Sequence, residues 1–143
     1  MGTDYENLLK ENGILVFVPS GESMWPTLKD KGQSVVIMPK KDKLKKWDVV
    51  FYKRPNGQYV LHRIVDVFVD EYVLCGDNHL EYEYGITDKM IIGYMAGYYK
   101  GKKFVETKGK KGSRLAIFLH KHRFIKRVYT KLFYRRKLAD NER

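Results

Sequence analysis

Three side chains in this sequence make up the inventory of a serine–histidine–acid catalytic group, in that order along the chain. Ser23 lies in a loop bounded by glycine and proline, just after the apolar run of residues 14–18. A serine hydroxyl is a weak nucleophile until a neighbouring base accepts its proton. His62 lies in a strand-like segment, and an imidazole with a pKa of about 6.5 can accept that proton at neutral pH. Asp77 follows in a third block and supplies a carboxylate that could orient the histidine.

Each of these residues also has an ordinary structural interpretation. Ser23 could cap a turn, His62 could be a half-buried strand histidine bonded to backbone, and Asp77 could shape its own turn. Two lysines, Lys53 and Lys89, compete as bases. A lysine base needs burial that lowers its pKa by several units, and Lys53 is interpreted as solvated.

The elements that must position these side chains are mainly β. Apolar stretches are short and separated by turn signals, among them the hairpin sequence Asn56-Gly57. A helix is expected over residues 3–11, with Asp4 as its N-cap. Strands are expected over residues 14–18, 33–38, 48–52, 58–68, 72–75, 90–99 and 104–107. The fold class is therefore a mainly β, antiparallel domain.

The positive charge of the chain is concentrated in its C-terminal part. The net charge is +11, and residues 113–138 hold nine Lys and Arg and no Asp or Glu. Residues 1–112 hold eighteen basic and fifteen acidic residues. We therefore divide the chain into a β domain over residues 1–112, which holds the candidate catalytic residues, and a basic tail over residues 113–143.

The tail is predicted to form one basic amphipathic helix over residues 114–138. Such a helix suits an anionic membrane surface through residues 113–138; alternatively, it packs its apolar side on the β domain and leaves its lysines solvated. Nucleic acid is not expected as a partner, because no reader motif accompanies the charges. The apolar side consists of Leu115, Phe118, Leu119, Ile125, Tyr129, Leu132 and Phe133.

Four blocks of the chain resemble, in order, the conserved boxes of type I signal peptidases, which are related to the self-cleaving repressors of the SOS response. The resemblance implies a curled, partly closed antiparallel β fold with an active-site groove along its edge. It also implies a serine endopeptidase that cleaves a leader or signal-type peptide or preprotein, with Ser23 as nucleophile and His62 as general base. The blocks are Ser23-Met24-Trp25-Pro26-Thr27-Leu28 and residues 47–51, 60–64 and 76–78.

The base position separates two types within that family. Most bacterial signal peptidases hold a lysine there, whereas the endoplasmic-reticulum type and its bacterial counterparts hold a histidine. His62 makes this chain similar to the second type. The orienting acid stays open between Asp77 and Glu83, because the histidine-type relatives place it several residues beyond the Gly76-Asp77-Asn78 block. Glu81 and Asp88 also lie in that region, and no acid there aligns cleanly.

The oxyanion hole is expected to combine the Ser23 backbone N–H with a second donor from the same loop. Relatives of one type use a serine hydroxyl two residues before the nucleophile, where this chain has Gly21. Either the Ser20 hydroxyl reaches the site or only backbone groups serve. Met24 and Trp25 are expected to line the substrate groove or, alternatively, to anchor the loop in the core.

No metal or cofactor is expected. The four histidines, at positions 62, 79, 120 and 122, show no ligand spacing with cysteines or carboxylates, and the two in the tail are expected to be solvated. Cys75, the only cysteine, is expected to be a small core residue. No secretory signal or apolar run of eighteen residues is visible. We therefore expect a cytoplasmic location, peripheral at the inner face of the membrane, in contrast to the membrane-held signal peptidases.

Two alternatives to a leader-type peptidase remain open on the sequence. One is a catalytically inactive binding module of the same fold, recruited to a membrane or nucleic acid by its tail. The other is a self-cleaving relative of the repressors, although no internal cleavage site stands out.

Overall fold

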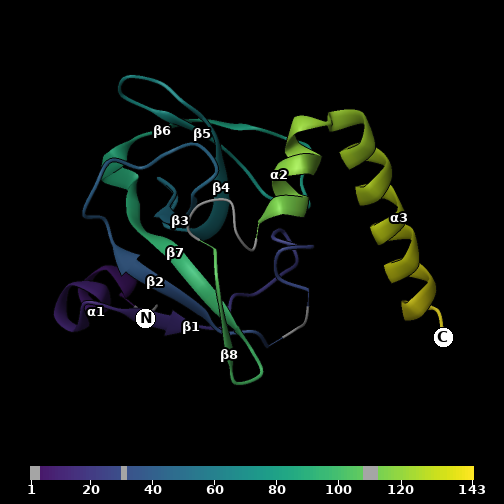
Figure 1. Ribbon diagram of the computed structural model, residues 1–143, viewed down its shortest axis with the longest axis horizontal. Coiled ribbons are helices and arrows are strands. Elements are labelled where there is room, and N and C mark those ends of the chain that lie inside the picture. The colour runs from purple at the N-terminus through teal and green to yellow at the C-terminus, as the bar shows by residue number, and fades with distance from the viewer. Residues whose placement is uncertain (1–3, 30–31, 108–112) are drawn as a thin grey trace.

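The centre of the protein is an antiparallel β-sheet, seen in a computed structural model that describes residues 4–29, 32–107 and 113–143 (Figure 1). The mainly β fold class is therefore confirmed. The strands are β1 (Leu15–Phe17), β2 (Val35–Pro39), β3 (Val49–Lys53), β4 (Tyr59–Val67), β5 (Tyr72–Cys75), β6 (Glu83–Ile86), β7 (Ile91–Lys100) and β8 (Lys103–Glu106). The helices are α1 (Tyr5–Asn12), α2 (Arg114–Lys121) and α3 (Arg123–Asn141), with a short 3-10 helix η1 (Asp88–Met90).

The strands lie in the order β1-β2-β7-β3-β4-β5-β6, and β8 pairs with β7. The hairpin of β3 and β4 fixes the position of the candidate base. Its turn contains Gly57 at a φ of +88°, a conformation that glycine adopts without strain, and its register sets Val50 opposite His62. Because side chains alternate along a strand, Tyr52 lies on the same face of the sheet as His62.

Helix α1 is capped at its N-terminus by Asp4, whose side chain accepts a hydrogen bond from the Asn7 backbone N–H (3.2 Å), which confirms the predicted N-cap.

The sheet buries two apolar clusters. Burial of each large aliphatic side chain contributes about 1.5–3 kcal/mol, so these clusters stabilise the sheet that carries the site. One cluster contains Leu9, Val35, Ile37, Phe51 and Met95, and the other contains Val50, Tyr52, Ile64, Leu74 and Ile91.

The seven predicted strands are all present, with ends within two residues of those expected. Strand β6 was not predicted from the sequence. Of its residues, Ile86 alone is buried, whereas Tyr84 and Gly85 are exposed, so the strand lacks the alternation that marks a half-buried strand. The segment 108–112, part of the predicted linker, lies outside the described residues.

The prediction of a single tail helix over residues 114–138 is wrong. The chain leaves the helical conformation at His122, which separates α2 from α3 (Figure 1). In a continuous helix, side chains six residues apart would point about 120° away from each other. The break instead brings the imidazole of His120 and the ammonium of Lys126 within 3.2 Å, and both lie buried against the sheet.

The predicted apolar side of the tail is only partly buried. Leu119 is buried, Tyr129 stacks on Trp25 of the β domain, and Phe133 packs against the same ring at a tilt. The tail therefore packs on the β domain through both apolar and polar side chains, the buried ones being Ala116, Ile117, Leu119, His120, Lys126 and Thr130. The other four residues of that side, Leu115, Phe118, Ile125 and Leu132, are 44–55 % exposed.

Candidate active site

The loop that carries Ser23 is held against the turn that follows β5. The Asn78 backbone N–H donates to the Ser23 carbonyl oxygen (2.8 Å), and the Asn78 side-chain amide donates to the Glu22 carbonyl oxygen (3.2 Å). The Thr27 hydroxyl donates to the Asp77 carboxylate (2.5 Å). These bonds tie both ends of the loop to one turn and so fix where Ser23 lies.

Gly76 marks the point where the candidate groups meet. A Cβ atom added to Gly76 would lie 2.8 Å from the Ser23 carbonyl oxygen, 3.0 Å from His79 Nδ1 and 3.1 Å from His62 Nε2. The structure therefore brings the Ser23 backbone and His62 Nε2 to the same place. Within the described residues, no hydrogen bond joins the Ser23 hydroxyl to His62 itself. Catalytic hydrogen bonds are often long in ligand-free sites and shorten when substrate binds.

A chain of polar side chains lies behind His62. The Tyr52 hydroxyl donates to Glu83 Oε2 (2.5 Å), and its oxygen lies 3.3 Å from His62 Nδ1. Arg54 donates two hydrogen bonds to Glu83, each of 2.9 Å. Because the tyrosine proton is committed to Glu83, the tyrosine oxygen is an acceptor for a proton on Nδ1. This tautomer leaves the lone pair of His62 on Nε2, the nitrogen that borders Gly76 as the Ser23 carbonyl oxygen does.

The ionisation of these groups suits a neutral base. Burial, and then the neighbouring His79, lower the pKa of His62 to about 4, so that the ring is neutral at neutral pH. Burial alone would raise the pKa of Glu83, but hydrogen bonds from Arg54 and Tyr52 outweigh it and lower that pKa. The chain behind His62 therefore ends in an ionised carboxylate.

The Asp77 carboxylate interacts with Arg63 and His120 rather than with His62. Its carboxylate accepts two hydrogen bonds from the buried guanidinium of Arg63 (2.8 and 2.9 Å) and lies 2.8 Å from His120 Nε2. Burial would raise the pKa of Asp77, but the charge and hydrogen bonds of Arg63 and His120 hold it well below its usual range. Arg63 is thus an ion-pair residue. Among the described hydrogen bonds, none connects Asp77 with His62, and the acid linked to His62 through a side chain is Glu83.

A buried lysine attaches the tail to the same turn. Lys126 Nζ donates to the Gly76 carbonyl oxygen (3.1 Å) and lies 3.2 Å from His120 Nδ1 and 3.4 Å from Cys75 Sγ. Burial lowers the pKa of Lys126. Because Nδ1 of His120 accepts from the ammonium, its Nε2 carries the proton that is donated to Asp77. The expectation that His120 is solvated is wrong, whereas Cys75 is buried as predicted.

The residues expected around the oxyanion hole occupy different environments. Ser20 and Gly21 are exposed, and Gly21 has a φ of +81°. The Glu22 carboxylate forms an ion pair with Lys137 of α3 (2.5 Å), which turns its charge toward the tail. Met24 is 4 % exposed and belongs to the first apolar cluster, so the alternative of core anchoring describes it.

Sequence reasoning missed Tyr52, Arg54, His79 and Lys126. A signal existed for Tyr52, because the predicted hairpin turn at Asn56-Gly57 implies a register, and the observed register sets Tyr52 on the same face as His62. No local signal existed for Lys126. Its burial depends on a helix break and on a partner turn 50 residues earlier in the chain.

The chain matches no model of a known protein family, and no curated protein matches it significantly. Among the described helices, none is long and apolar enough to cross a membrane. In the described part of the chain, no three side chains of His, Cys, Asp or Glu gather in a way that could hold a metal ion.

Proposed function

We propose that this protein is a signal-peptidase-like serine endopeptidase, in which Ser23 attacks the peptide carbonyl and His62 accepts its proton. The observation that carries the proposal is that the Ser23 carbonyl oxygen and His62 Nε2 both border Gly76, 2.8 and 3.1 Å from where a Cβ on that residue would lie. The Tyr52–Glu83 pair supports it, because it favours the tautomer that a general base requires. The curled signal-peptidase fold and the substrate, a leader or signal-type peptide, belong to the same proposal.

The proposed mechanism assigns a role to each group. His62 takes the Ser23 proton through Nε2 and becomes a cation, which the ionised Glu83 stabilises through Tyr52. The Ser23 backbone N–H is the expected first donor to the oxyanion, and each such donor contributes about 3 kcal/mol to lowering the barrier. The ion pair with Lys137 draws the charge of Glu22 toward α3. His62 then returns the proton to the leaving amine.

The test is cleavage of a mixture of leader-like peptides with small side chains at the cleavage position, with products identified by mass spectrometry. The full chain should release endoproteolytic fragments. Tyr52→Phe removes the hydroxyl that orients His62 and should lower kcat/KM at least about tenfold. Tyr84→Phe is the matched control, because Tyr84 is 67 % exposed on β6. Absence of fragments with every peptide would leave the inactive binding module as the better description.

The pH dependence gives a second check. A general base must be neutral, and the pKa of His62 is lowered to about 4. The acid limb of the kcat/KM profile, which reports the free enzyme, should therefore fall near pH 4 rather than near the ordinary histidine value of about 6.5. A midpoint of that limb at the ordinary value would contradict the burial of the base.

We also infer a membrane contact for the tail. Phe124, Val128 and Leu132 lie at intervals of four residues on α3 and are 78 %, 45 % and 55 % exposed. Exposed apolar side chains among Lys and Arg suit an anionic lipid surface. The double variant Phe124→Ser, Val128→Ser should bind vesicles containing phosphatidylserine roughly tenfold more weakly than the unmodified chain. Equal sedimentation of both proteins with these vesicles would exclude this contact.

A further inference from the structure

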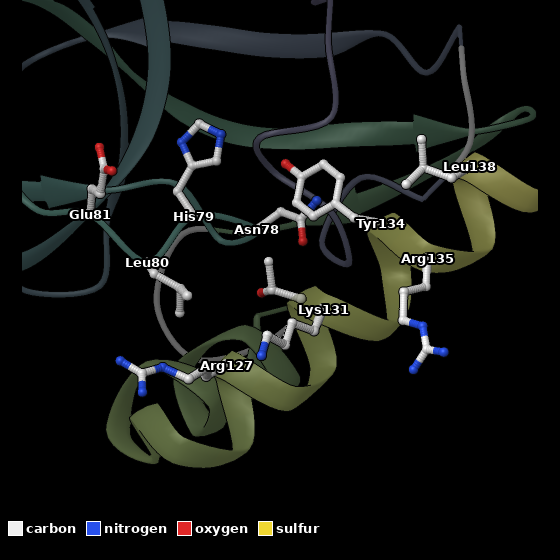
Figure 2. Close-up of a pocket in the computed structure, with 10 residues that line it drawn as sticks. Asn78, His79, Leu80, Glu81, Arg127, Lys131, Tyr134, Arg135 and Leu138 are labelled. Atoms are coloured by element: carbon white, nitrogen blue, oxygen red, sulfur yellow. The ribbon is translucent and has the colours of Figure 1, made fainter.

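A groove of about 800 Å³ lies between the turn after β5 and one side of α3 (Figure 2). Residues 78–81 form one wall. The groove adjoins the candidate active site, because the first residue of that wall bonds to the Ser23 carbonyl oxygen and the ring of His79 lies 5.3 Å from the ring of His62. The α3 wall consists of Arg127, Thr130, Lys131, Tyr134, Arg135 and Leu138.

The α3 wall carries a row of positive charge. Arg127, Lys131 and Arg135 follow one another at intervals of four residues, so they lie along one strip of the helix. None of the three forms an ion pair with another described residue. The opposite wall contributes a single carboxylate, Glu81. The groove therefore favours a ligand with negative charge.

An unpaired hydrogen-bond acceptor lies buried behind the wall of the groove. Asn78 is 1 % exposed, and its Oδ1 has no partner among the described residues. The orientation of the amide is fixed, because its Nδ2 donates to the Glu22 carbonyl oxygen. Figure 2 shows the carboxamide oxygen turned toward α3. A buried acceptor without a partner is costly. Because this oxygen is closed off from solvent, a peptide N–H would reach it only after the side chains beside it move aside.

We propose that this groove binds an acidic segment of the peptide substrate, next to the bond that is cleaved. The proposal rests on the proposed function, since it names the class of substrate for the same site. Residues 127–138 of α3 span about 16 Å, the length of about five residues of extended peptide. Carboxylates of such a segment pair with the three cations, and its apolar side chains pack on Leu80, Tyr134 and Leu138.

The binding test uses the full chain with Ser23→Ala, which cannot cleave its ligand. The probes are a fluorescent peptide with alternating Glu and Leu residues and a peptide of the same length with Gln in place of Glu. The triple variant Arg127→Gln, Lys131→Gln, Arg135→Gln should weaken binding of the acidic peptide at least about tenfold, as expected for three exposed ion pairs. The matched control is Lys100→Gln, Lys102→Gln, Lys103→Gln at the turn between β7 and β8, which should change binding less than about threefold.

Three results would overturn the proposal that the groove binds an acidic peptide. The first is equal affinity for the two peptides, and the second is equal weakening by the two triple variants. The third is that the Arg127, Lys131, Arg135 variant loses binding to vesicles but keeps its affinity for the acidic peptide. The last result would assign the cations to the membrane. Phe124→Ser, Val128→Ser should leave the affinity for the acidic peptide unchanged.

Kinetics separate failure of the groove from failure of the proposed function. With the catalytic serine present, the groove variant should raise KM for an acidic substrate while kcat changes little, because the interaction is made equally in the ground and transition states. Tight binding of the acidic peptide without any cleavage would contradict the proposed peptidase function but support the proposed peptide-binding groove. Cleavage with the same KM for acidic and neutral substrates would contradict the proposed binding of acidic peptides in the groove but support the proposed peptidase function.

Discussion

Replacing Ser23 with alanine is expected to lower kcat/KM for a cleavable peptide by at least about 10⁴-fold. The change removes the atom that attacks the carbonyl, and no other described group at the site is assigned that role. In serine peptidases generally, loss of the nucleophile leaves only the residual rate that comes from binding and oxyanion stabilisation. The measurement is initial cleavage rate at substrate concentrations below KM.

The same variant should unfold at nearly the same temperature as the unmodified chain. The loop is held by the Ser23 carbonyl oxygen and by Thr27, and neither contact uses the Ser23 hydroxyl. Ser34→Ala, on a second half-buried serine, is the matched control and should keep full activity. Unchanged cleavage by Ser23→Ala would rule out the mechanism, whereas a loss of activity that follows a large drop in unfolding temperature would have to be attributed to folding.

Replacing Asp77 with alanine is expected to cost about 3–5 kcal/mol of folding free energy, the largest stability effect we anticipate. The change leaves the guanidinium of Arg63, whose side chain is 0 % exposed, without its counter-ion. It also removes the acceptor of His120 and Thr27. The unfolding temperature should fall by about 10 °C or more. Asp70→Ala, at an exposed aspartate, should change it little.

A double-variant cycle tests the ion pair itself. Arg63→Met alone should be about as costly as Asp77→Ala, because it leaves the buried carboxylate without its guanidinium partner, with only His120 and Thr27 donating to it. The two changes together should cost less than their sum. An additive result would mean that the pair does not couple.

The stability should also depend on pH through Asp77. Its pKa is depressed in the folded chain, so its contribution is complete above the unfolded value of about 3.9 and is lost as the pH falls toward the folded value. The free energy of unfolding should therefore decrease below about pH 4, and Asp77→Asn should remove that part of the decrease. His62, whose pKa is lowered, acts in the same direction between about pH 6.5 and its folded value of about 4.

The β strands were predictable because their local sequence favours the extended conformation. The β-branched and aromatic residues of β4 and the Asn-Gly turn before it predict a hairpin without reference to the rest of the chain. Strand β6 carries no such pattern, since its backbone pairs with β5 while Tyr84 and Gly85 stay exposed. The break between the two tail helices has no local breaker either, as neither Gly nor Pro lies near His122.

The candidate site likewise contains residues that could be predicted from the sequence and residues that could not. Ser23 and His62 come from short blocks that can be found in the sequence, and the structure brings the backbone of the first to the ring of the second. The assignment of the acids could not be made from spacing. Which carboxylate serves His62 depends on Tyr52, which links it to Glu83, and on Arg63 and His120, which occupy Asp77.

The attachment of Lys126 to the turn after β5 has a practical consequence for anyone who shortens this protein. A stop codon placed before α2 would remove the ammonium group that caps the Gly76 carbonyl oxygen, and it would uncover the aspartate–arginine pair beneath. Fragments ending near residue 107 should therefore express poorly or lose the arrangement of side chains around Gly76. Affinity tags belong after Arg143, since α3 runs outward to that end of the chain (Figure 1).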